Sequence, residues 1–321
     1  MRHSLQNQNP DFKYSVSPLQ YKRLKKHING ILLLDKPLGF SSNQALQKIK
    51  WLLQAAKAGH TGTLDPLATG LLPLCFGEAT KFAHYLTDAD KTYVAIVKLG
   101  VTTTTGDAEG EVLSTQPVHI SQVQLEQACR QFVGEISQVP PMYSALKHEG
   151  KALYEYARAG VEIERKARNV TIHHITLNAF ADSVATITVT CSKGTYIRTL
   201  AEDIGKQLGC GAHLIGLRRT ATANYQITQA MTLEQFEALS AEQRIAALRP
   251  ADSAVLHLPA LTLDADSTYY LQQGQAVWRS GSIPQGLLRL YSEQEVFLGL
   301  GEQQSDGKIA PKRLVVDKDK N

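Results

Sequence analysis

Residues 59–73 read Gly-His-Thr-Gly-Thr-Leu-Asp-Pro-Leu-Ala-Thr-Gly-Leu-Leu-Pro, and the rest of the chain is organised around them. Three glycines and two prolines interrupt this stretch, so it forms neither one helix nor one central strand. Asp65 lies between two apolar residues, and His60 precedes it by five positions. A partly desolvated carboxylate in a glycine-rich loop suits nucleophilic or acid–base chemistry. From spacing alone, a surface turn in which Asp65 caps the following backbone is the alternative.

The residues before this loop predict a strand followed by a helix. Residues 30–37 form a short apolar run that ends at a proline, which indicates a buried strand. Ser41 and Ser42 are suitable N-caps, and apolar residues then recur at helical spacing from Leu46 to Ala56. We expect the helix to lead straight into the loop, so that strand and helix hold the Asp65 carboxylate rigidly.

A later stretch, residues 91–100, is rich in β-branched side chains and predicts a strand that opens with Tyr93. A core or cross-strand position is the alternative for this tyrosine. Residues 79–86 and 125–133 predict helices on either side of this strand in the sequence.

Residues 184–190 predict a further strand, which runs into Cys-Ser-Lys-Gly-Thr-Tyr-Ile-Arg-Thr-Leu at 191–200. Tyr196 and Arg198 are two positions apart, so on an extended segment both point to the same face. Arg198 could then pair with Asp65 and keep it ionised, although its spacing alone indicates a surface residue.

Residues 138–168 interleave tyrosines with basic side chains. Cations next to aromatic rings suit phosphate contacts combined with base stacking. A solvated helix face is the alternative for several of these residues. The basic members are Lys147, Lys151, Arg158, Arg165, Lys166 and Arg168.

The two ends of the chain differ from its middle. Residues 1–28 are polar and aperiodic with a basic cluster at 22–26, and we expect a flexible, solvated tail; an arm that touches RNA phosphates is the alternative for the basic end. Residues 239–259 read as a helix and a connector. The short apolar runs that follow predict a small β-barrel-like module.

Length and composition limit the possible classes. At 321 residues the chain can hold one large and one small domain, and its net charge of +4 is compatible with a polyanionic partner without indicating one. Four cysteines without Cys-x-x-Cys spacing predict free thiols in a reducing cytoplasm. We find no dinucleotide fingerprint, phosphate-binding loop or metal-ligand spacing. We also find no signal peptide and no apolar run of transmembrane length, so we expect a cytoplasmic protein.

Several stretches together resemble one family, from about residue 29 to the end of the chain. The pattern G-H-T-G-x-L-D-P-x-A-T-G-x-L at 59–72 is similar to the catalytic loop of the TruB family of tRNA pseudouridine synthases. Further segments agree with that family: L-L-L-D-K-P at 32–37, K-x-Y-x-x-x-x-x-L-G at 91–100, P-P-M-Y-S-A-L-K at 140–147, C-S-K-G-T-Y-I-R-T at 191–199 and G-A-H-x-x-x-L-R-R at 211–219.

The resemblance implies a role for each candidate site residue. Asp65 matches the nucleophilic aspartate and is the expected catalytic residue. The expected substrate-binding residues are His60, which fills the space vacated in the RNA; Tyr93, which faces the target uridine; Tyr196, which stacks on the flipped base; Arg198, which pairs with the aspartate; and Leu217, which lines the uracil pocket.

The implied activity is isomerisation of uridine 55 in the T-loop of tRNA to pseudouridine, by base flipping and an aspartate-dependent glycosidic rearrangement. This chemistry is neither redox nor hydrolysis, so we expect no cofactor and no metal. The expected partner is the T-arm of tRNA, without a guide RNA and without a membrane, and the expected state is a monomer.

The implied fold class is α+β: the pseudouridine synthase fold, a mixed, largely antiparallel central sheet flanked by helices, with a small C-terminal PUA-like β-barrel domain. We expect a basic tail at 1–28, a catalytic domain at 29–255 with an RNA-clasping insertion at about 138–168, and a PUA-like RNA-binding domain at 256–321. The candidate phosphate ligands of the last domain are Arg279, Lys308, Lys312 and Arg313.

Two other functions remain open on the sequence. One is a non-catalytic RNA-binding or RNA-folding module on the same scaffold, which the intact set of Asp65, Tyr93 and Arg198 disfavours. The other is the related guide-RNA-dependent synthase subunit, which shares the catalytic loop and works in a multiprotein particle. The insertion at 138–168 and the short C-terminal module favour the stand-alone enzyme.

Overall fold

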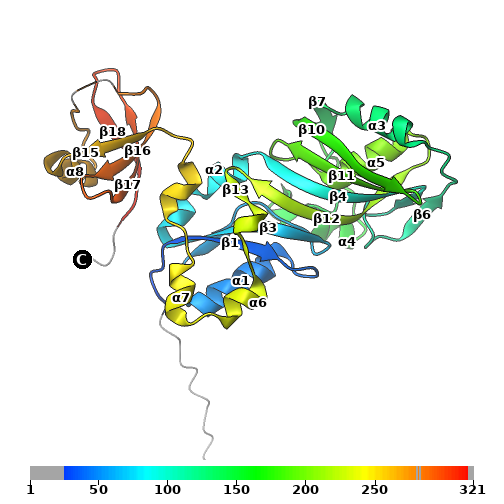
Figure 1. Cartoon of the computed structure of the whole chain (residues 1–321), viewed down its shortest axis with the longest axis horizontal. Helices are drawn as coiled ribbons and strands as arrows, with labels where there is room; N and C mark the ends of the chain where they lie inside the picture. Colours follow the sequence, from blue (N-terminus) through cyan, green and yellow to red (C-terminus); the bar gives the residue numbers. More distant parts are fainter. Residues whose placement is uncertain (1–24, 280, 282, 317–321) are drawn as a thin grey trace, which may run out of the picture.

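A computed structural model describes residues 25–279, 281 and 283–316. The greater part of the predicted basic tail, residues 1–24, lies outside this description. Within the described residues, ten strands form one mixed central sheet, in which β14-β1-β3-β12-β4-β11-β10-β7 are neighbours, β2 pairs with β3 and β13 with β12 (Figure 1). These strands are β1 (Gly30–Lys36), β2 (Ala58–His60), β3 (Ala68–Phe76), β4 (Lys91–Leu99), β7 (Gly134–Gln138), β10 (Arg168–Ala181), β11 (Val184–Cys191), β12 (Ala212–Thr222), β13 (Tyr225–Gln226) and β14 (Met231–Thr232).

Most neighbouring pairs in this sheet are antiparallel, and the exceptions are β1 with β14 and β3 with β12. The predicted mixed, largely antiparallel sheet is therefore confirmed. Strands β4 and β11 alternate buried and more exposed residues, as expected for a sheet with one strongly covered face. Strand β1 is buried along nearly its whole length, which explains its continuous apolar run.

Helices cover the sheet in two groups (Figure 1). Helices α3 and α5 pack together, with α3 against β10 and α5 against β12, whereas α1, α6 and α7 lie near β1 and β14. The helices before the C-terminal module are α1 (Ser42–Leu53), α2 (Ala83–Asp88), α3 (Gln122–Gln131), α4 (Leu153–Arg158), α5 (Ile197–Gln207), α6 (Leu233–Ala238) and α7 (Ala241–Ala246), with 3-10 turns at Gly77–Phe82, Ile227–Gln229 and Ala251–Val255.

Helix α1 begins and ends where its backbone hydrogen bonds require it. Ser41 is the N-cap and forms a reciprocal capping box with Gln44. Gln54 adopts a left-handed conformation and ends the helix two residues before the predicted Ala56. The helix is followed after a short connection by the stretch at 59–73, whose first two residues were not predicted to be part of a strand but belong to β2, which pairs with β3.

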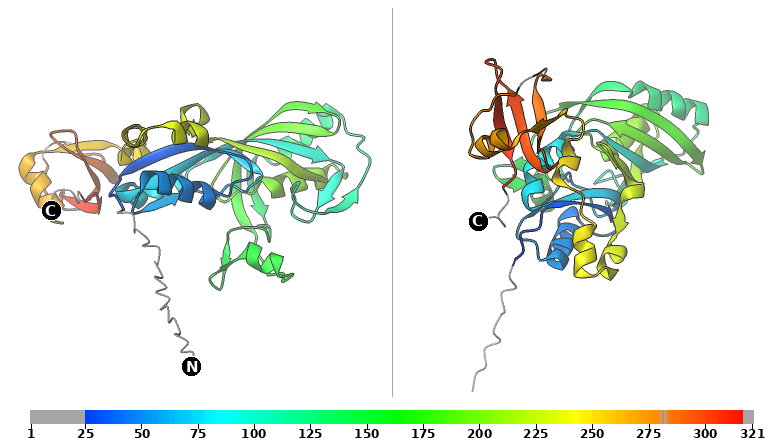
Figure 2. Two further views of the ribbon diagram at one scale, coloured as in Figure 1. Left: turned by 90° about the horizontal axis from the view of Figure 1, so that it is seen from below. Right: turned by 60° about the vertical axis from the view of Figure 1, so that its left-hand side comes forward.

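The segment between β7 and β10 carries little regular structure of its own. It contains the two-residue strands β8 (Lys147–His148) and β9 (Lys151–Ala152) and the short helix α4. Figure 2 shows this green segment projecting from the sheet. A second small hairpin, β5 (Val101–Thr103) with β6 (Val112–Thr115), extends from the end of β4.

The C-terminal module is a separate four-stranded sheet in the order β15-β16-β17-β18. Its elements are β15 (Ala260–Leu263), α8 (Ala265–Gln272), β16 (Leu287–Ser292), β17 (Phe297–Gln303) and β18 (Ile309–Leu314). Within the described residues these four strands follow one another in an open order, and an isolated bridge places Val277 beside Ile309 of β18; closure into a barrel stays a prediction. The prediction of an all-β module also missed α8. This helix is capped at its start by the Asp264 side chain, which accepts a hydrogen bond from the Ser267 N–H.

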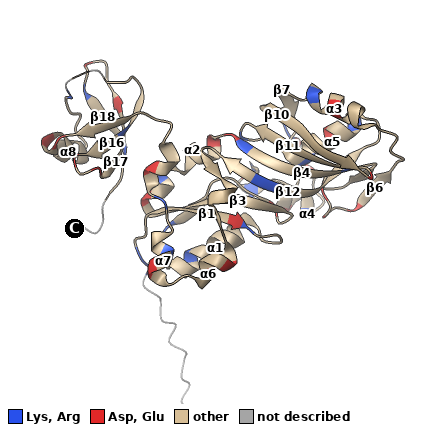
Figure 3. Cartoon of the chain, in the orientation of Figure 1, with Lys and Arg blue, Asp and Glu red and all other residues tan. Residues whose placement is uncertain are grey.

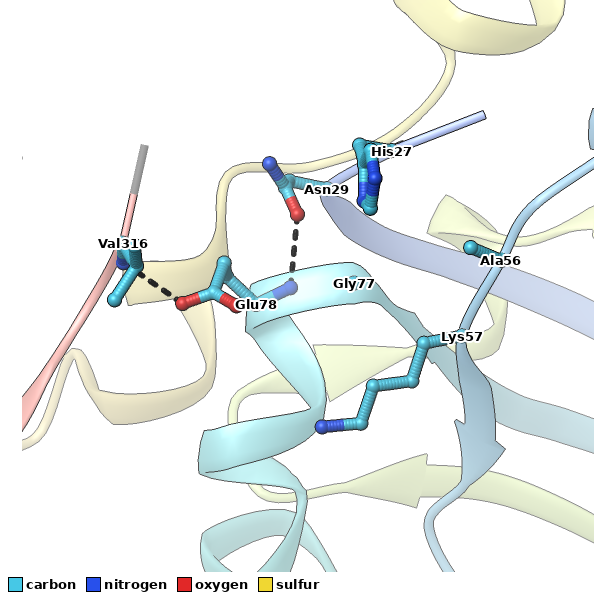
Figure 4. Close-up of a pocket in the computed structure, with 7 residues that line it drawn as sticks. All are labelled: His27, Asn29, Ala56, Lys57, Gly77, Glu78 and Val316. Carbon is cyan, nitrogen blue, oxygen red and sulfur yellow. Dashed lines mark hydrogen bonds between the residues drawn. The ribbon is translucent and has the colours of Figure 1, made fainter. Parts of the chain in front are cut away.

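A small polar contact joins this module to the main sheet (Figure 4). Glu78 accepts a hydrogen bond from the Val316 N–H at 2.8 Å, and Lys81 Nζ donates to the Leu314 carbonyl at 2.8 Å. A cavity of about 160 Å³ adjoins the contact and is lined by His27, Asn29, Ala56, Lys57, Gly77, Glu78 and Val316.

Candidate active site

The loop that carries Asp65 is tied to the start of α1. The Ser42 hydroxyl accepts a hydrogen bond from the Leu64 N–H at 2.7 Å and lies 3.0 Å from the Leu64 carbonyl oxygen, to which it can donate. The Gly39 N–H donates to the Pro66 carbonyl at 2.9 Å. Residues on both sides of Asp65 are therefore fixed by a segment far away in sequence, as a preorganised site requires.

Arg198 lies beside Asp65 at the beginning of α5. Its guanidinium is 3.1 Å from an Asp65 carboxylate oxygen and 3.3 Å from an oxygen of Asp107. The arginine side chain is 7% exposed, whereas that of Asp65 is 42% exposed at the open side. The predicted juxtaposition of Asp65 and Arg198 is present, but the predicted extended segment was wrong. Tyr196 is the N-cap of α5 and Arg198 is already helical.

The charge state of Asp65 results from opposing effects. Removal of water from around the carboxylate raises its pKa from 3.8, and Asp107 raises it further. Arg198 and Lys36 lower it. The net direction is upward, so Asp65 is a base somewhat stronger than an exposed aspartate, although the arginine still favours its ionised form.

One pocket, with a volume of about 370 Å³, is lined by five of the six predicted site residues: Asp65, Tyr93, Tyr196, Arg198 and Leu217. They come from the loop before β3, from β4, from the start of α5 and from β12. Burial raises the pKa of both tyrosines, so their phenol rings are neutral at pH 7. A planar base would meet two aromatic rings and a leucine here, with a carboxylate and a guanidinium at one side.

The sixth predicted residue, His60, lines an adjoining cavity of about 480 Å³, which shares Asp65 and Arg198 with the first pocket. Burial and the nearby Arg219 lower the pKa of His60, so its imidazole is neutral at pH 7. Its buried Nδ1 has no hydrogen-bond partner among residues 25–279, 281 and 283–316. The ring therefore lines the same cavity as Asp65 without being held by a neighbouring polar group of the described residues at that atom.

Three residues of the site were not recognised as such in the sequence. Asp107 lies in a turn-rich loop that offered no sequence signal, and Ser42 was considered only as a helix cap. Arg219 is 1% exposed; its Nε donates to the Leu71 carbonyl at 2.6 Å, and it lines the same pocket as Tyr93. The alternation of neighbouring strand residues could have separated Arg219 from Arg218.

Arg218 faces away from Arg219 and binds Asp35, with a guanidinium-to-carboxylate distance of 2.6 Å. Figure 3 shows positive and negative residues spread over the chain, without one face of a single charge. The two adjacent arginines therefore differ in their surroundings: Arg218 forms an ion pair with Asp35, and the buried Arg219 lies at the pocket.

Among the described residues, no three His, Cys, Asp or Glu side chains are grouped so that they could hold a metal ion. Of the helices in the same part of the chain, none combines the length and apolar character that a membrane span needs.

Comparisons with known proteins agree with this geometry. A family model described as TruB family pseudouridylate synthase (N terminal domain) matches residues 50–197. Residues 198–256 match a tRNA pseudouridylate synthase B C-terminal domain, and residues 259–315 match a model described as Pseudouridine synthase II TruB, C-terminal.

Two curated relatives span nearly the same length. The chain is 63% identical over 297 residues to tRNA pseudouridine synthase B of Methylobacillus flagellatus, which covers 92% of this chain and 98% of the relative. It is 55% identical over 301 residues to the protein of the same name from Pseudomonas aeruginosa, which covers 92% and 99%.

Among solved structures, a chain in the crystal structure of a Cbf5-Nop10-Gar1 complex is 27% identical, with a TM-score of 0.68. The match covers 91% of this chain and 85% of that chain. The family models, the identities and the shared fold agree, and the chain belongs to the TruB family of pseudouridine synthases.

Proposed function

We propose that this protein isomerises uridine 55 in the T-loop of tRNA to pseudouridine. The main observation behind the proposal is the single pocket that gathers Asp65, Arg198, two tyrosines and Leu217. The names of the two relatives, tRNA pseudouridine synthase B, support tRNA as the substrate. Position 55 follows from the resemblance of the catalytic loop.

The reaction breaks the bond between N1 of uracil and C1′ of ribose and forms a bond between C5 and C1′. The C5 proton is lost and N1 gains one, so atoms and electrons balance without a cofactor. Asp65 supplies the carboxylate, as a nucleophile at C1′ or C6 or as the group that acts on a glycal intermediate. Arg198 favours the ionised form of Asp65, and the pocket keeps the detached base next to the ribose.

Presentation of the base requires it to leave the RNA stack, at a cost of a few kcal/mol. His60 is assigned the space that the base vacates. This assignment is supported by its place in the lining of a cavity that Asp65 also lines, and by its neutral, partly buried ring. Tyr93 and Tyr196 then stack against the extruded uracil.

The remaining assignments concern the partner and the place of action. The enzyme works in the cytoplasm as a monomer on the T-arm, without a guide RNA. The insertion at 138–168 closes over the RNA, and the C-terminal module binds it in a PUA-like manner. The candidate phosphate ligands of that module are Arg279, Lys308, Lys312 and Arg313.

The guide-RNA-dependent alternative draws some support from the structural similarity to a chain of the Cbf5-Nop10-Gar1 complex. The much higher identity to the two bacterial relatives favours the stand-alone enzyme. A non-catalytic RNA-binding module is disfavoured because the carboxylate, guanidinium and tyrosines line one pocket.

The test uses the purified full chain, an unmodified tRNA transcript and no guide RNA, with pseudouridine mapped by chemical modification and primer extension. We expect pseudouridine at position 55 only. Asp65→Asn should bind the transcript normally and lower the rate by at least about a thousandfold. Binding without isomerisation by the wild-type protein would support the non-catalytic alternative, and activity only with a guide RNA would support the other.

A further inference from the structure

Gln138, the last residue of β7, has an unusual set of partners. Its side-chain Oε1 accepts a hydrogen bond from the Tyr196 N–H at 3.0 Å, and its Nε2 donates to the Tyr196 carbonyl at 3.3 Å. The residue is 2% exposed. Both ends of one buried amide are therefore satisfied by the backbone of a single residue that lines the pocket.

This contact lies where α5 begins. Tyr196 is the N-cap of α5, but its side chain makes no capping hydrogen bond. A helix start is usually fixed by such a cap, because its first N–H groups lack partners within the helix. Here the Gln138 amide fixes the backbone of the cap residue itself. Arg198 follows two residues later, so its direction depends on the same helix start.

Gln138 also stands at the base of the insertion at 138–168. It is the register partner of Arg168 in the pairing of β7 with β10, so these two residues close the base of the insertion. Within the insertion, the Tyr143 carbonyl accepts a hydrogen bond from Arg198 Nη2 at 2.5 Å. The insertion thus makes hydrogen bonds to the start of α5 through Tyr143 and through Gln138.

We propose that Gln138 is a positioning residue, which sets the orientation of Tyr196 and Arg198 in the pocket by holding the start of α5. It touches neither the base nor Asp65 and acts through the backbone of Tyr196. The inference rests on the proposed function for its effect on the rate, but the positioning itself is a property of the free protein.

The variants are Gln138→Leu, which removes both hydrogen bonds, and Gln138→Glu, which keeps the shape and the acceptor but, when ionised, replaces the donor with a charged oxygen. Gln131→Leu is the matched control, because that glutamine lies at the end of α3 and its exposed side chain only accepts a bond from Gln207. Melting temperatures verify that each variant is folded, and Gln138→Glu serves if Gln138→Leu does not fold.

The first measurement is amide hydrogen exchange in the free protein. We expect faster exchange at residues 196–200 in both Gln138 variants and no change there in Gln131→Leu. This measurement does not depend on activity. Unchanged exchange at the start of α5 would overturn the inference even if the enzyme makes pseudouridine, whereas an inactive wild-type protein would overturn only the proposed function.

The second measurement is the single-turnover rate on tRNA, together with tRNA affinity. We expect Gln138→Leu to lower the rate by between about tenfold and a hundredfold at unchanged tRNA affinity, because small displacements of catalytic groups are costly. The rate of Gln138→Glu should lie between those of Gln138→Leu and the wild type. The acidic limb of the pH profile of Gln138→Leu should move to higher pH, since a displaced Arg198 stabilises the Asp65 carboxylate less. A wild-type rate and pH profile in both variants would contradict the proposal.

Discussion

One guanidinium stands between two carboxylates at the centre of the site. Arg198 contacts Asp65 at 3.1 Å and Asp107 at 3.3 Å, and both Arg198 and Asp107 are almost completely buried. The two terminal nitrogens also donate to the backbone carbonyls of Thr105 and Tyr143. A buried arginine with four contacts on its two terminal nitrogens is held firmly, so it helps to fix the more exposed Asp65 as well.

The first prediction concerns Asp107→Asn. Loss of this charge removes an effect that raises the pKa of Asp65, and an amide facing Arg198 leaves the guanidinium to Asp65 alone. Both changes lower the pKa of Asp65. Activity that needs ionised Asp65 should therefore persist to lower pH than in the wild type, which single-turnover rates across the acidic range would measure.

Glu111→Gln provides the control for this prediction, because Glu111 is an exposed carboxylate in the same loop. Its pH profile should match that of the wild type. A shift of the acidic limb to higher pH in Asp107→Asn would mean that Asp107 chiefly orients Arg198 and that its charge is unimportant for Asp65.

At the residue scale, the sequence motifs and the family resemblance identified the residues that line the pocket, but not the residues that hold them in place. Asp107 could not be predicted, because a carboxylate among turn-forming residues usually bonds its own loop, and this one does so through Thr105 and the Glu109 N–H. Its long-range contact with Arg198 depends on the tertiary fold. The error about Tyr196 and Arg198 arose because the prediction took residues 196–198 as extended, whereas the helix already begins at Ile197.

Strands β3 and β12 approach each other unusually closely beneath the pocket. Gly70 has φ of +101°, and a Cβ at this position would lie 2.3 Å from the Arg219 carbonyl oxygen. Only glycine tolerates both this positive φ and this short distance. A glycine at position 70 therefore allows the parallel pairing of β3 with β12, which holds Leu217 and Arg219 beside the Asp65 loop.

The second prediction is that Gly70→Ala destabilises the protein by about 3 kcal/mol, through backbone strain and steric overlap with β12. Urea unfolding followed by circular dichroism measures this loss. Gly59→Ala in β2 is the control, since its Cβ would meet no atom within 4 Å, and it should change stability by less than about 1 kcal/mol. Equal stability of the two variants would contradict the close approach.

The insertion at 138–168 is the element with the least support of its own. Its regular structure is limited to two strands of two residues and one short helix, so it should open more easily in the free protein than the central sheet does. Arg158 lies over the ring of Tyr154, with 5.3 Å from its guanidinium carbon to the ring centre. This pair lines the cavity beside His60, where RNA is expected.

The third prediction is that tRNA slows amide exchange across residues 140–168 by at least about tenfold, because bound RNA makes opening more costly. Mass-spectrometric hydrogen exchange with and without tRNA measures the effect. Exchange in α3, which packs against β10 and α5 and contributes no residue to either pocket, should stay constant. Unchanged protection in the insertion would exclude an RNA-clasping role.

Strong periodic segments could be predicted at the element scale, and β1, β4 and β11 lie within a residue or two of their expected bounds. Their β-branched or continuous apolar runs leave little choice. Helix α8 could not be predicted in this way, because its eight residues lack an amphipathic stripe and include β-branched and aromatic side chains. Its cap at Asp264 was the available signal.

At the scale of the whole molecule, the two sheets are linked by a mixed apolar and charged contact. Phe82 and Phe297 place their ring centres 5.4 Å apart across the boundary, and Leu300 shares a buried cluster with Phe82. The Tyr291 hydroxyl donates to Asp252 at 2.6 Å. If the C-terminal module binds RNA, these contacts determine how firmly the bound RNA is held relative to the central sheet. A loss of these contacts should therefore affect function.

The charged part of this contact depends on Glu78. Burial alone would raise its pKa, but hydrogen bonds from Lys81 and from the Val316 N–H outweigh burial and lower it below 4.5. A carboxylate with a depressed pKa stabilises the fold above its unfolded pKa, and this contribution is lost as pH falls through the folded value.

The fourth prediction follows for Glu78→Gln. At pH 7 it should lower the free energy of unfolding by about 1 kcal/mol, because a neutral amide accepts weaker bonds from Lys81 and Val316. The difference from wild type should shrink as pH falls below 4.5, where Glu78 itself becomes protonated. Glu302→Gln is the control, since its pair with Lys312 is exposed and lies within the C-terminal sheet. Calorimetry at pH 7 and at acidic pH measures both variants, and a pH-independent loss in Glu78→Gln would show that its charge does not hold the two sheets together.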